Sequence, residues 1–132
     1  MSNWGRRIST EPVAIVAVVF MVAMGVARAL MGENAREITI VAKDMAFYVE
    51  GNPTANPPIE ARAGETLRIV LENRDRGLTH DFAVPSVDAS TDVLKWNEQD
   101  DVTFEVPSEP GTYEYVCRPH LLMMKGTLTV VR

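Results

Sequence analysis

The sequence predicts an all-β fold, a Greek-key β-sandwich, preceded by one hydrophobic N-terminal helix. Residues 12–27 contain no charged side chain and consist mostly of Val, Ala, Ile, Met and Phe. After residue 36, short segments alternate polar and apolar side chains, which is typical of half-buried strands. Gly, Pro and Asn punctuate these segments, and no amphipathic helical pattern interrupts them. About seven short strands in about 100 residues favour a sandwich.

Residues 1–32 are predicted to be a targeting or anchoring segment, and residues 33–132 the folded domain. Arg6 and Arg7 precede the apolar run, as they do in a signal peptide or an N-terminal membrane anchor. The small-x-small sequence at 27–29 suits cleavage, whereas the run with its flanks reaches about 20 residues, enough to cross a bilayer. We favour the anchor. In both cases the arginines hold the N-terminus inside, and the domain is extracytoplasmic, in the periplasm or on the outer face of the membrane.

The predicted domain is acidic and contains a single cysteine. From residue 33 onward there are seventeen Asp and Glu against ten Lys and Arg, an excess of seven negative charges. This balance argues against nucleic acid as a partner. A lone cysteine outside the cytoplasm forms no internal disulfide and is open to oxidation, so binding of its thiolate to a metal is a good reason to keep it.

The strands are predicted from period-two alternation and from the turns between them. They cover residues 37–42, 45–49, 66–73, 80–84, 102–106, 112–117 and 126–131. Residues 51–58 hold three prolines and two asparagines and are predicted to be a loop, while residues 85–100 fit either a short helix or a loop. In the strand at 112–117, Tyr113, Tyr115 and Cys117 share one face, which we expect to point inward.

Three residue types that bind copper, Cys, His and Met, occur together near the C-terminus. Cys117, His120 and a methionine, Met123 or Met124, lie on one tight loop between the last two strands, and His80 lies upstream. Thiolate and thioether favour the reduced ion and imidazoles suit both oxidation states, so one Cys, two His and a Met form a mononuclear blue-copper site. This interpretation uses the only cysteine and both histidines of the chain.

Three motifs resemble the cupredoxins, the family of plastocyanin, amicyanin and azurin. Tyr-x-Tyr-x-Cys-x-Pro-His at 113–120 resembles plastocyanin and amicyanin, and Met-Lys-Gly-Thr-Leu-Thr at 124–129 resembles the final strand of azurin. Leu-Thr-His-Asp-Phe at 78–82 resembles the family's upstream histidine motif. The resemblance covers roughly residues 37–132 and implies a cupredoxin-like domain with one type 1 copper. The implied ligands are His80, Cys117, His120 and Met124.

The resemblance leaves two positions to decide. Met123 would give the His-x2-Met spacing of amicyanin, but the Met-x-Gly spacing of the family selects Met124 as the axial ligand, with Met123 as a packing residue. The family usually has Asn after the upstream histidine, and here Asp81 takes that place. We expect Asp81 to accept hydrogen bonds from the ligand loop and, as a carboxylate, to lower the reduction potential.

The function implied is that of a one-electron carrier rather than an enzyme. A Cys-His nucleophile would need an open substrate site, structural zinc would need more thiolate or imidazole, and binuclear or multicopper centres need more Cys or His. We expect redox proteins to dock at the His120 edge, on an apolar patch of Leu121, Leu122 and Met123, and we expect no small-molecule substrate. The alternatives are a module for copper storage, delivery or sensing, and a docking domain of a larger redox complex.

Overall fold

The structure is a computed structural model that describes residues 34–132. The elements are β1 (Arg36–Lys43), β2 (Ala46–Val49), β3 (Ile59–Arg62), β4 (Thr66–Asn73), β5 (Ala83–Val84), the 3₁₀ turn η1 (Pro85–Val87), β6 (Ala89–Ser90), β7 (Gln99–Glu105), β8 (Gly111–Val116), the 3₁₀ turn η2 (Arg118–His120) and β9 (Lys125–Val131). The predicted all-β class is therefore confirmed for these residues. The predicted hydrophobic helix lies outside them, and no helix within residues 34–132 is long and apolar enough to cross a bilayer.

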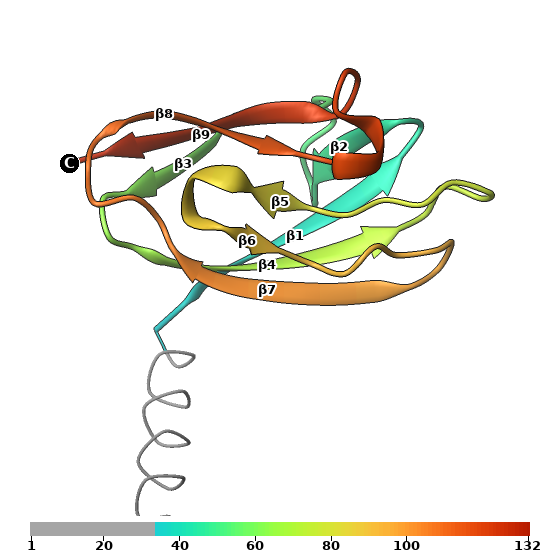
Figure 1. The fold of residues 1–132 in the computed structure, drawn as a ribbon, viewed down its shortest axis with the longest axis horizontal. Helices are drawn as coiled ribbons and strands as arrows, with labels where there is room; N and C mark the ends of the chain where they lie inside the picture. Colours follow the sequence, from blue (N-terminus) through green and yellow to red (C-terminus); the bar gives the residue numbers. More distant parts are fainter. Residues whose placement is uncertain (1–33) are drawn as a thin grey trace, which may run out of the picture. The chain divides into compact units, whose positions relative to one another are not determined.

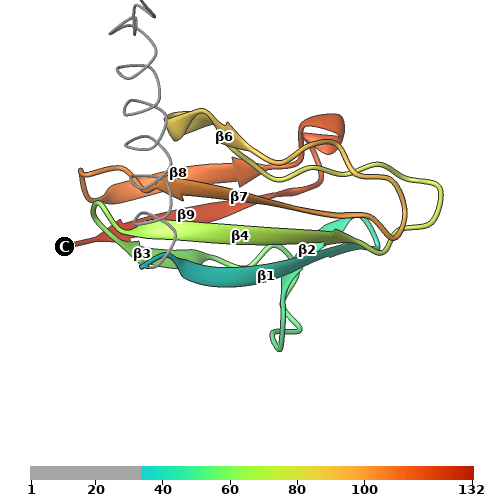
Figure 2. The same cartoon turned by 90° about the horizontal axis from the view of Figure 1, so that it is seen from below.

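The strands form two sheets (Figure 1). One has the order β2-β1-β4-β7 and the other the order β3-β9-β8-β5-β6. Strand β1 runs parallel to β4 and β3 runs parallel to β9, while the remaining pairs are antiparallel. Four of the seven neighbouring strand pairs are not consecutive in the chain, and several connections cross from one sheet to the other, as the turned view of Figure 2 shows.

The core lies between the sheets and follows from the alternation of the strands. In β1 the side chains of Ile38, Ile40 and Ala42 are buried, and in β4 those at 67, 69 and 71. Three aromatic rings pack together in this core near the end of β8. Phe47 lies edge-on to Phe82 and to Tyr115 with centroids 5.7 Å away in each case, and Phe82 stacks on Tyr115 at 5.2 Å.

Two regions differ from the sequence prediction. Strand β3 was not predicted, because it follows the proline-rich loop and shows only four residues of alternation before the next turn. It is stabilised by parallel pairing with β9. In the segment predicted as a strand at 80–84, only β5 is a strand, and residues 85–100 hold η1 and the two-residue β6 rather than an α-helix. Both segments take their shape from long-range pairing that local periodicity does not encode.

One backbone pair places the upstream histidine next to the cysteine. Ala83 of β5 pairs with Val116 of β8 in an antiparallel register. Continuing this register toward the end of β8 puts Phe82 opposite Cys117 and Asp81 opposite Arg118. The segment before β5 and the loop after β8 therefore lie side by side at one end of the sandwich.

Candidate metal centre

The loop that carries three of the predicted ligands spans residues 117–124 and is called the ligand loop here. It begins where β8 ends and closes where β9 begins. The amide of Cys117 donates to the carbonyl of Met124 at 2.9 Å, while the amides of His120 and Met124 donate to the carbonyls of Cys117 and His120 at 3.0 and 2.9 Å. Because these hydrogen bonds join its two ends, the loop keeps Cys117 and Met124 beside each other.

His80 is held from outside the ligand loop. Its amide donates to the carbonyl of Leu94 at 3.0 Å, and its carbonyl accepts from the amide of Leu94 at 2.7 Å. The fully buried ring has Nδ1 3.7 Å from the Cys117 sulfur and Nε2 2.9 Å from a carboxylate oxygen of Asp75. Since a carboxylate only accepts, Nε2 carries the proton. Burial lowers the pKa of His80 although Asp75 opposes this, so the ring is neutral and Nδ1 presents its lone pair to the sulfur side.

His120 lies beside this pair at the edge of the domain. Its ring is half-buried, with its centroid 5.0 Å from that of His80. Its Nε2 lies 3.1 Å from the carbonyl oxygen of Thr79, which only accepts, so a neutral ring again keeps its lone pair on Nδ1. No cluster of three or more His, Cys, Asp and Glu side chains tight enough to hold a metal occurs in residues 34–132. The structure thus brings His80 and Cys117 together and leaves His120 as their neighbour.

Cys117 and Met124 place two sulfur atoms in the interior. Both residues are fully buried and belong to the hydrophobic core. Burial raises the pKa of the Cys117 thiol, so binding a cation there includes loss of the thiol proton. The neighbouring Met123 is 63% exposed. Of the two methionines weighed from the sequence, Met124 alone is buried in the core cluster that also contains Cys117.

Asp81 ties the ligand loop to the segment that carries His80. One oxygen of its fully buried carboxylate accepts from the amide of Arg118 at 2.7 Å, and the other accepts from the Arg118 guanidinium. The same guanidinium reaches the carbonyl of Thr91 at 3.4 Å. Asp81 therefore has the geometry to orient the loop. Its charge is balanced by Arg118, however, so we now expect a smaller effect on the reduction potential than an unpaired carboxylate would have.

Two supporting residues were not predicted from the sequence. The buried Asn73 donates from Nδ2 to the carbonyls of Leu78 and Leu94, at 2.9 Å each, and its side-chain oxygen accepts from the amide of Asp75 at 2.9 Å. Asp75 binds His80 directly. The sequence offered no local signal for either role, because residues 74–77 have the composition of a charged, solvent-facing turn.

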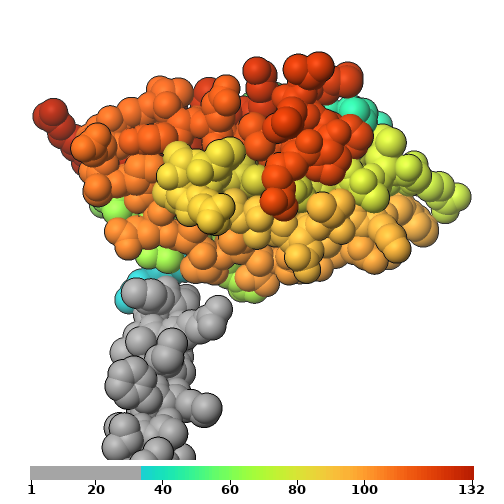
Figure 3. All heavy atoms as spheres, viewed as in Figure 1, coloured from blue at the N-terminus to red at the C-terminus, as the bar shows by residue number. Residues whose placement is uncertain are grey.

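The outer face of the ligand loop is apolar. Leu121, Leu122 and Met123 are all exposed, Leu122 by 93%. Together with Arg118, Pro119 and His120 they line a shallow hollow. Figure 3 shows the loop as an orange-red patch at the surface of the domain. This end of the molecule therefore places apolar side chains around the half-buried His120 ring.

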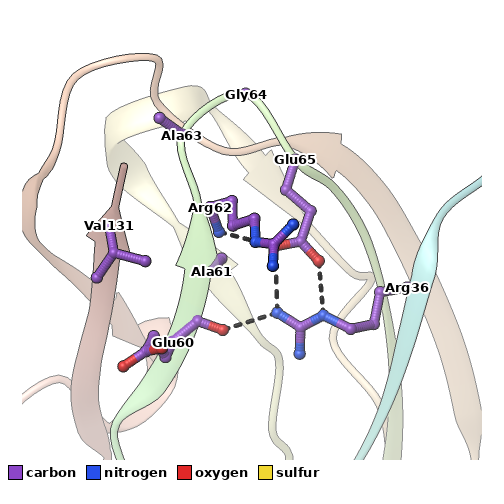
Figure 4. Close-up of a pocket in the computed structure, with 8 residues that line it drawn as sticks. All are labelled: Arg36, Glu60, Ala61, Arg62, Ala63, Gly64, Glu65 and Val131. Atoms are coloured by element: carbon purple, nitrogen blue, oxygen red, sulfur yellow. Dashed lines mark hydrogen bonds and ion pairs between the residues drawn. The ribbon is translucent and has the colours of Figure 1, made fainter.

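A second hollow has no comparable chemistry (Figure 4). Its lining includes Arg36, Glu65 and Val131, and no His, Cys or Met. Arg36 is already engaged by the Glu65 carboxylate at 2.6 Å and by the carbonyl of Glu60 at 2.7 Å. Val131 ends β9, so the hollow lies roughly 20 Å along that strand from the ligand loop. The candidate site is therefore confined to the opposite end of the domain.

One thiol, two imidazoles whose Nε2 atoms face an oxygen acceptor and one buried thioether match the donors that a type 1 copper ion requires. A two-sheet domain with this donor set at one end belongs to the class of small copper-binding β-sandwiches. The chain is a member of the cupredoxin-like domain family, whose model matches residues 13–130.

Solved structures agree with this family. Auracyanin B is 25% identical, with a TM-score of 0.63 over 75% of this chain and 91% of that one. Auracyanin A, described as a "blue" copper protein from the green thermophilic photosynthetic bacterium Chloroflexus aurantiacus, is 22% identical, with a TM-score of 0.60 over 74% and 99%. Rusticyanin from Thiobacillus ferrooxidans is 21% identical, with a TM-score of 0.59 over 74% and 78%. No curated protein matches the sequence.

Proposed function

We propose that this protein is a type 1 copper protein that carries single electrons outside the cytoplasm. The observation that supports it most is the 3.7 Å approach of the Cys117 sulfur to Nδ1 of a neutral, fully buried His80. The proposed ligands are His80, Cys117, His120 and Met124. When bound, copper would supply the one-electron couple, and membership of a family composed mainly of electron carriers favours this use over catalysis.

The residues of the chain support rapid, repeated electron transfer in two ways. His80 is fixed at its backbone by Leu94 and at its ring by Asp75, so it has little freedom to move when the charge of the site changes. Core side chains exclude water from Cys117 and Met124. Rigid, dry ligands reduce the rearrangement that accompanies each electron, which is the physical requirement of a carrier.

The electron would enter and leave at the His120 edge. His120 is the only proposed ligand that is not fully buried, and the exposed residues Leu121, Leu122 and Met123 lie around it. An apolar patch of this size suits brief contact with a redox protein, because weak electron-transfer complexes bury little surface.

The test of the copper site is an absorption spectrum of the copper-reconstituted full-length chain, recorded beside Cys117→Ser. We expect intense visible colour and reversible one-electron reduction in the wild type, and loss of that colour in the variant, because the thiolate–copper bond is its source. A colourless wild type would contradict the proposal. Ready loss of copper to a competing chelator would point instead to storage or delivery.

The location is a separate part of the proposal. We propose that residues 1–32 tether the domain to the outer face of the cytoplasmic membrane, with secretion after cleavage as the alternative. Fractionation of cells that express the full-length chain, followed by protease treatment of spheroplasts, tests this. Membrane-bound protein that external protease degrades supports the tether, whereas free periplasmic protein lacking the segment supports cleavage.

A further inference from the structure

The carboxylate of Asp75 connects two parts of the fold that are distant in sequence. Its Oδ1 accepts from the amide of Asp44 at 2.7 Å, and its Oδ2 accepts from the amide of Met45 at 3.1 Å. The same Oδ2 lies 2.9 Å from Nε2 of His80. The Asp75 side chain is 13% exposed, and three donors converge on it. It is thus shared between a hairpin turn and the buried imidazole.

The hairpin turn that holds Asp75 has an unusual backbone. Lys43 pairs with Ala46, so Asp44 and Met45 form the two-residue connection between β1 and β2. Both have positive φ, 52° and 57°, as a type I′ turn requires, although Asn and Gly are the usual residues there. Two successive amides that point to one acceptor form a small anion-binding nest. The carboxylate of Asp75 fills it and offsets the cost of a left-handed methionine.

The backbone of Asp75 is also fixed. Its amide donates to the side-chain oxygen of Asn73 at 2.9 Å, and the Leu78 amide lies 3.4 Å from its carbonyl oxygen. Hydrogen bonds therefore hold both the main chain and the carboxylate of Asp75. As a result Oδ2, the oxygen that faces His80, has a defined position. The His80 ring meets a fixed acceptor rather than a mobile surface group.

We propose that Asp75 is the positioning residue of His80, and that it sets both the orientation of the ring and the electron density on Nδ1. With Nε2–H donated to Oδ2, the imidazole keeps Nδ1 directed toward the Cys117 side. A carboxylate behind a ligating imidazole makes that imidazole a stronger donor and favours the more highly charged oxidised ion. The part of the proposal that concerns copper rests on the proposed function, whereas the part that concerns the ring does not.

Asp81 provides an internal contrast. Asp81 directly follows His80 in the sequence, but both oxygens of its carboxylate face Arg118, which balances the charge. Within residues 34–132 no ion pair joins Asp75 to an Arg or Lys side chain, and the neutral His80 ring is its side-chain hydrogen-bond partner. The negative charge of Asp75 therefore acts on the imidazole without a balancing cation. We expect Asp75, rather than Asp81, to lower the reduction potential.

The first experiment needs no metal. ¹⁵N chemical shifts of the imidazoles in the metal-free, full-length chain report which nitrogen of His80 carries the proton. We expect the Nε2–H form in the wild type, and loss of that preference in Asp75→Ala, which removes the acceptor for Nε2–H. Asp88→Asn is the matched control, because it removes the same charge from an exposed residue that tolerates its left-handed φ of 50° as Asn. A wild-type ring protonated on Nδ1 overturns the proposal, even if Asp75→Ala does not fold.

The second experiment uses copper. In Asp75→Asn we expect the ratio of Cu(II) to Cu(I) affinity to fall about tenfold, which corresponds to a rise of about 59 mV in the reduction potential. Asp88→Asn should leave the potential unchanged. If Asp75→Ala keeps the wild-type tautomer and Asp75→Asn keeps the wild-type potential, Asp75 supports only the turn and the proposal is wrong. If the wild type gives no coloured copper protein, the proposed function fails while the tautomer result still decides the role of Asp75.

Discussion

The two halves of the candidate site are held in different ways. The first half consists of His80 and the residues that hold it. The His80 side chain is fully buried, its backbone pairs with Leu94 and its ring is bound by Asp75. The ligand loop is anchored at its ends, but its middle is at the surface, where Leu122 is 93% exposed. One half therefore fixes the geometry of the site and the other gives access to it. Substitutions in the first half should cost stability, and those in the second should affect exchange with partners.

Asn73→Ala tests the internal half most severely. It removes the hydrogen bonds to the carbonyls of Leu78 and Leu94 and the acceptor for the Asp75 amide, while the Leu94 carbonyl keeps the His80 amide. We expect the free energy of unfolding to fall by about 2–4 kcal/mol, measured by urea denaturation of the metal-free chain. Asn52→Ala is the control, because its side chain makes only an exposed contact to the Thr54 amide at 2.9 Å. A loss equal to that of the control would show that the His80 half does not depend on Asn73.

Arg118→Met tests the link between the halves. It leaves the buried Asp81 carboxylate with the Arg118 backbone amide but without the guanidinium. We expect a loss of about 1.5–3 kcal/mol, toward the lower figure because the Arg118 side chain is half exposed and water replaces part of the contact. Arg132→Met, at the exposed C-terminus, should change little. If both variants unfold at the same urea concentration, the Asp81–Arg118 pair does not hold the loop.

The opposite end of the domain predicts a smaller, pH-dependent effect. The hydrogen bond from Arg36 lowers the pKa of Glu65 in the folded state, so the pair stabilises the fold above the pKa of the unfolded chain. This stability is lost as the pH falls through the folded-state pKa. Glu65→Gln should therefore cost less than about 1 kcal/mol at pH 7 and progressively less as the pH falls through the folded-state pKa of Glu65, as measured by unfolding over this range. A cost that is larger at low pH would contradict this assignment.

Leu122→Lys should affect stability least and is the sharpest test of the exposed half. Because the side chain is in solvent, we expect a change within about 0.5 kcal/mol and an unaltered copper spectrum. Electron transfer to a redox partner should nevertheless slow several-fold, since a charge disrupts the apolar patch. Val93→Lys is a control at an exposed apolar residue outside the ligand loop. Equal rates for wild type and Leu122→Lys in stopped-flow measurements would remove the docking proposal.

How much could be predicted from the sequence differs between the same two regions. The ligand loop is local, so its residue types and spacing predicted the chemistry, and the burial of Met124 agrees with the choice made from the Met-x-Gly spacing. The support of His80 is not local. Asp75 and Asn73 lie in or beside a charged turn, and only the pairing of strands far apart in sequence shows that their side chains point inward. Strand β3 was missed for the same reason, because its partner β9 lies more than 60 residues away.

The hydrogen bond from the Cys117 amide to the Met124 carbonyl has an evolutionary consequence. This hydrogen bond adds one more pair to the β8–β9 ladder, directly after the pair of Val116 and Lys125. The residues between Cys117 and Met124 therefore form a loop outside the ladder. Insertions or deletions there leave the strand register intact. The length and sequence of the ligand loop can therefore vary during evolution, and with them the metal or the redox partner, while the two strands stay paired.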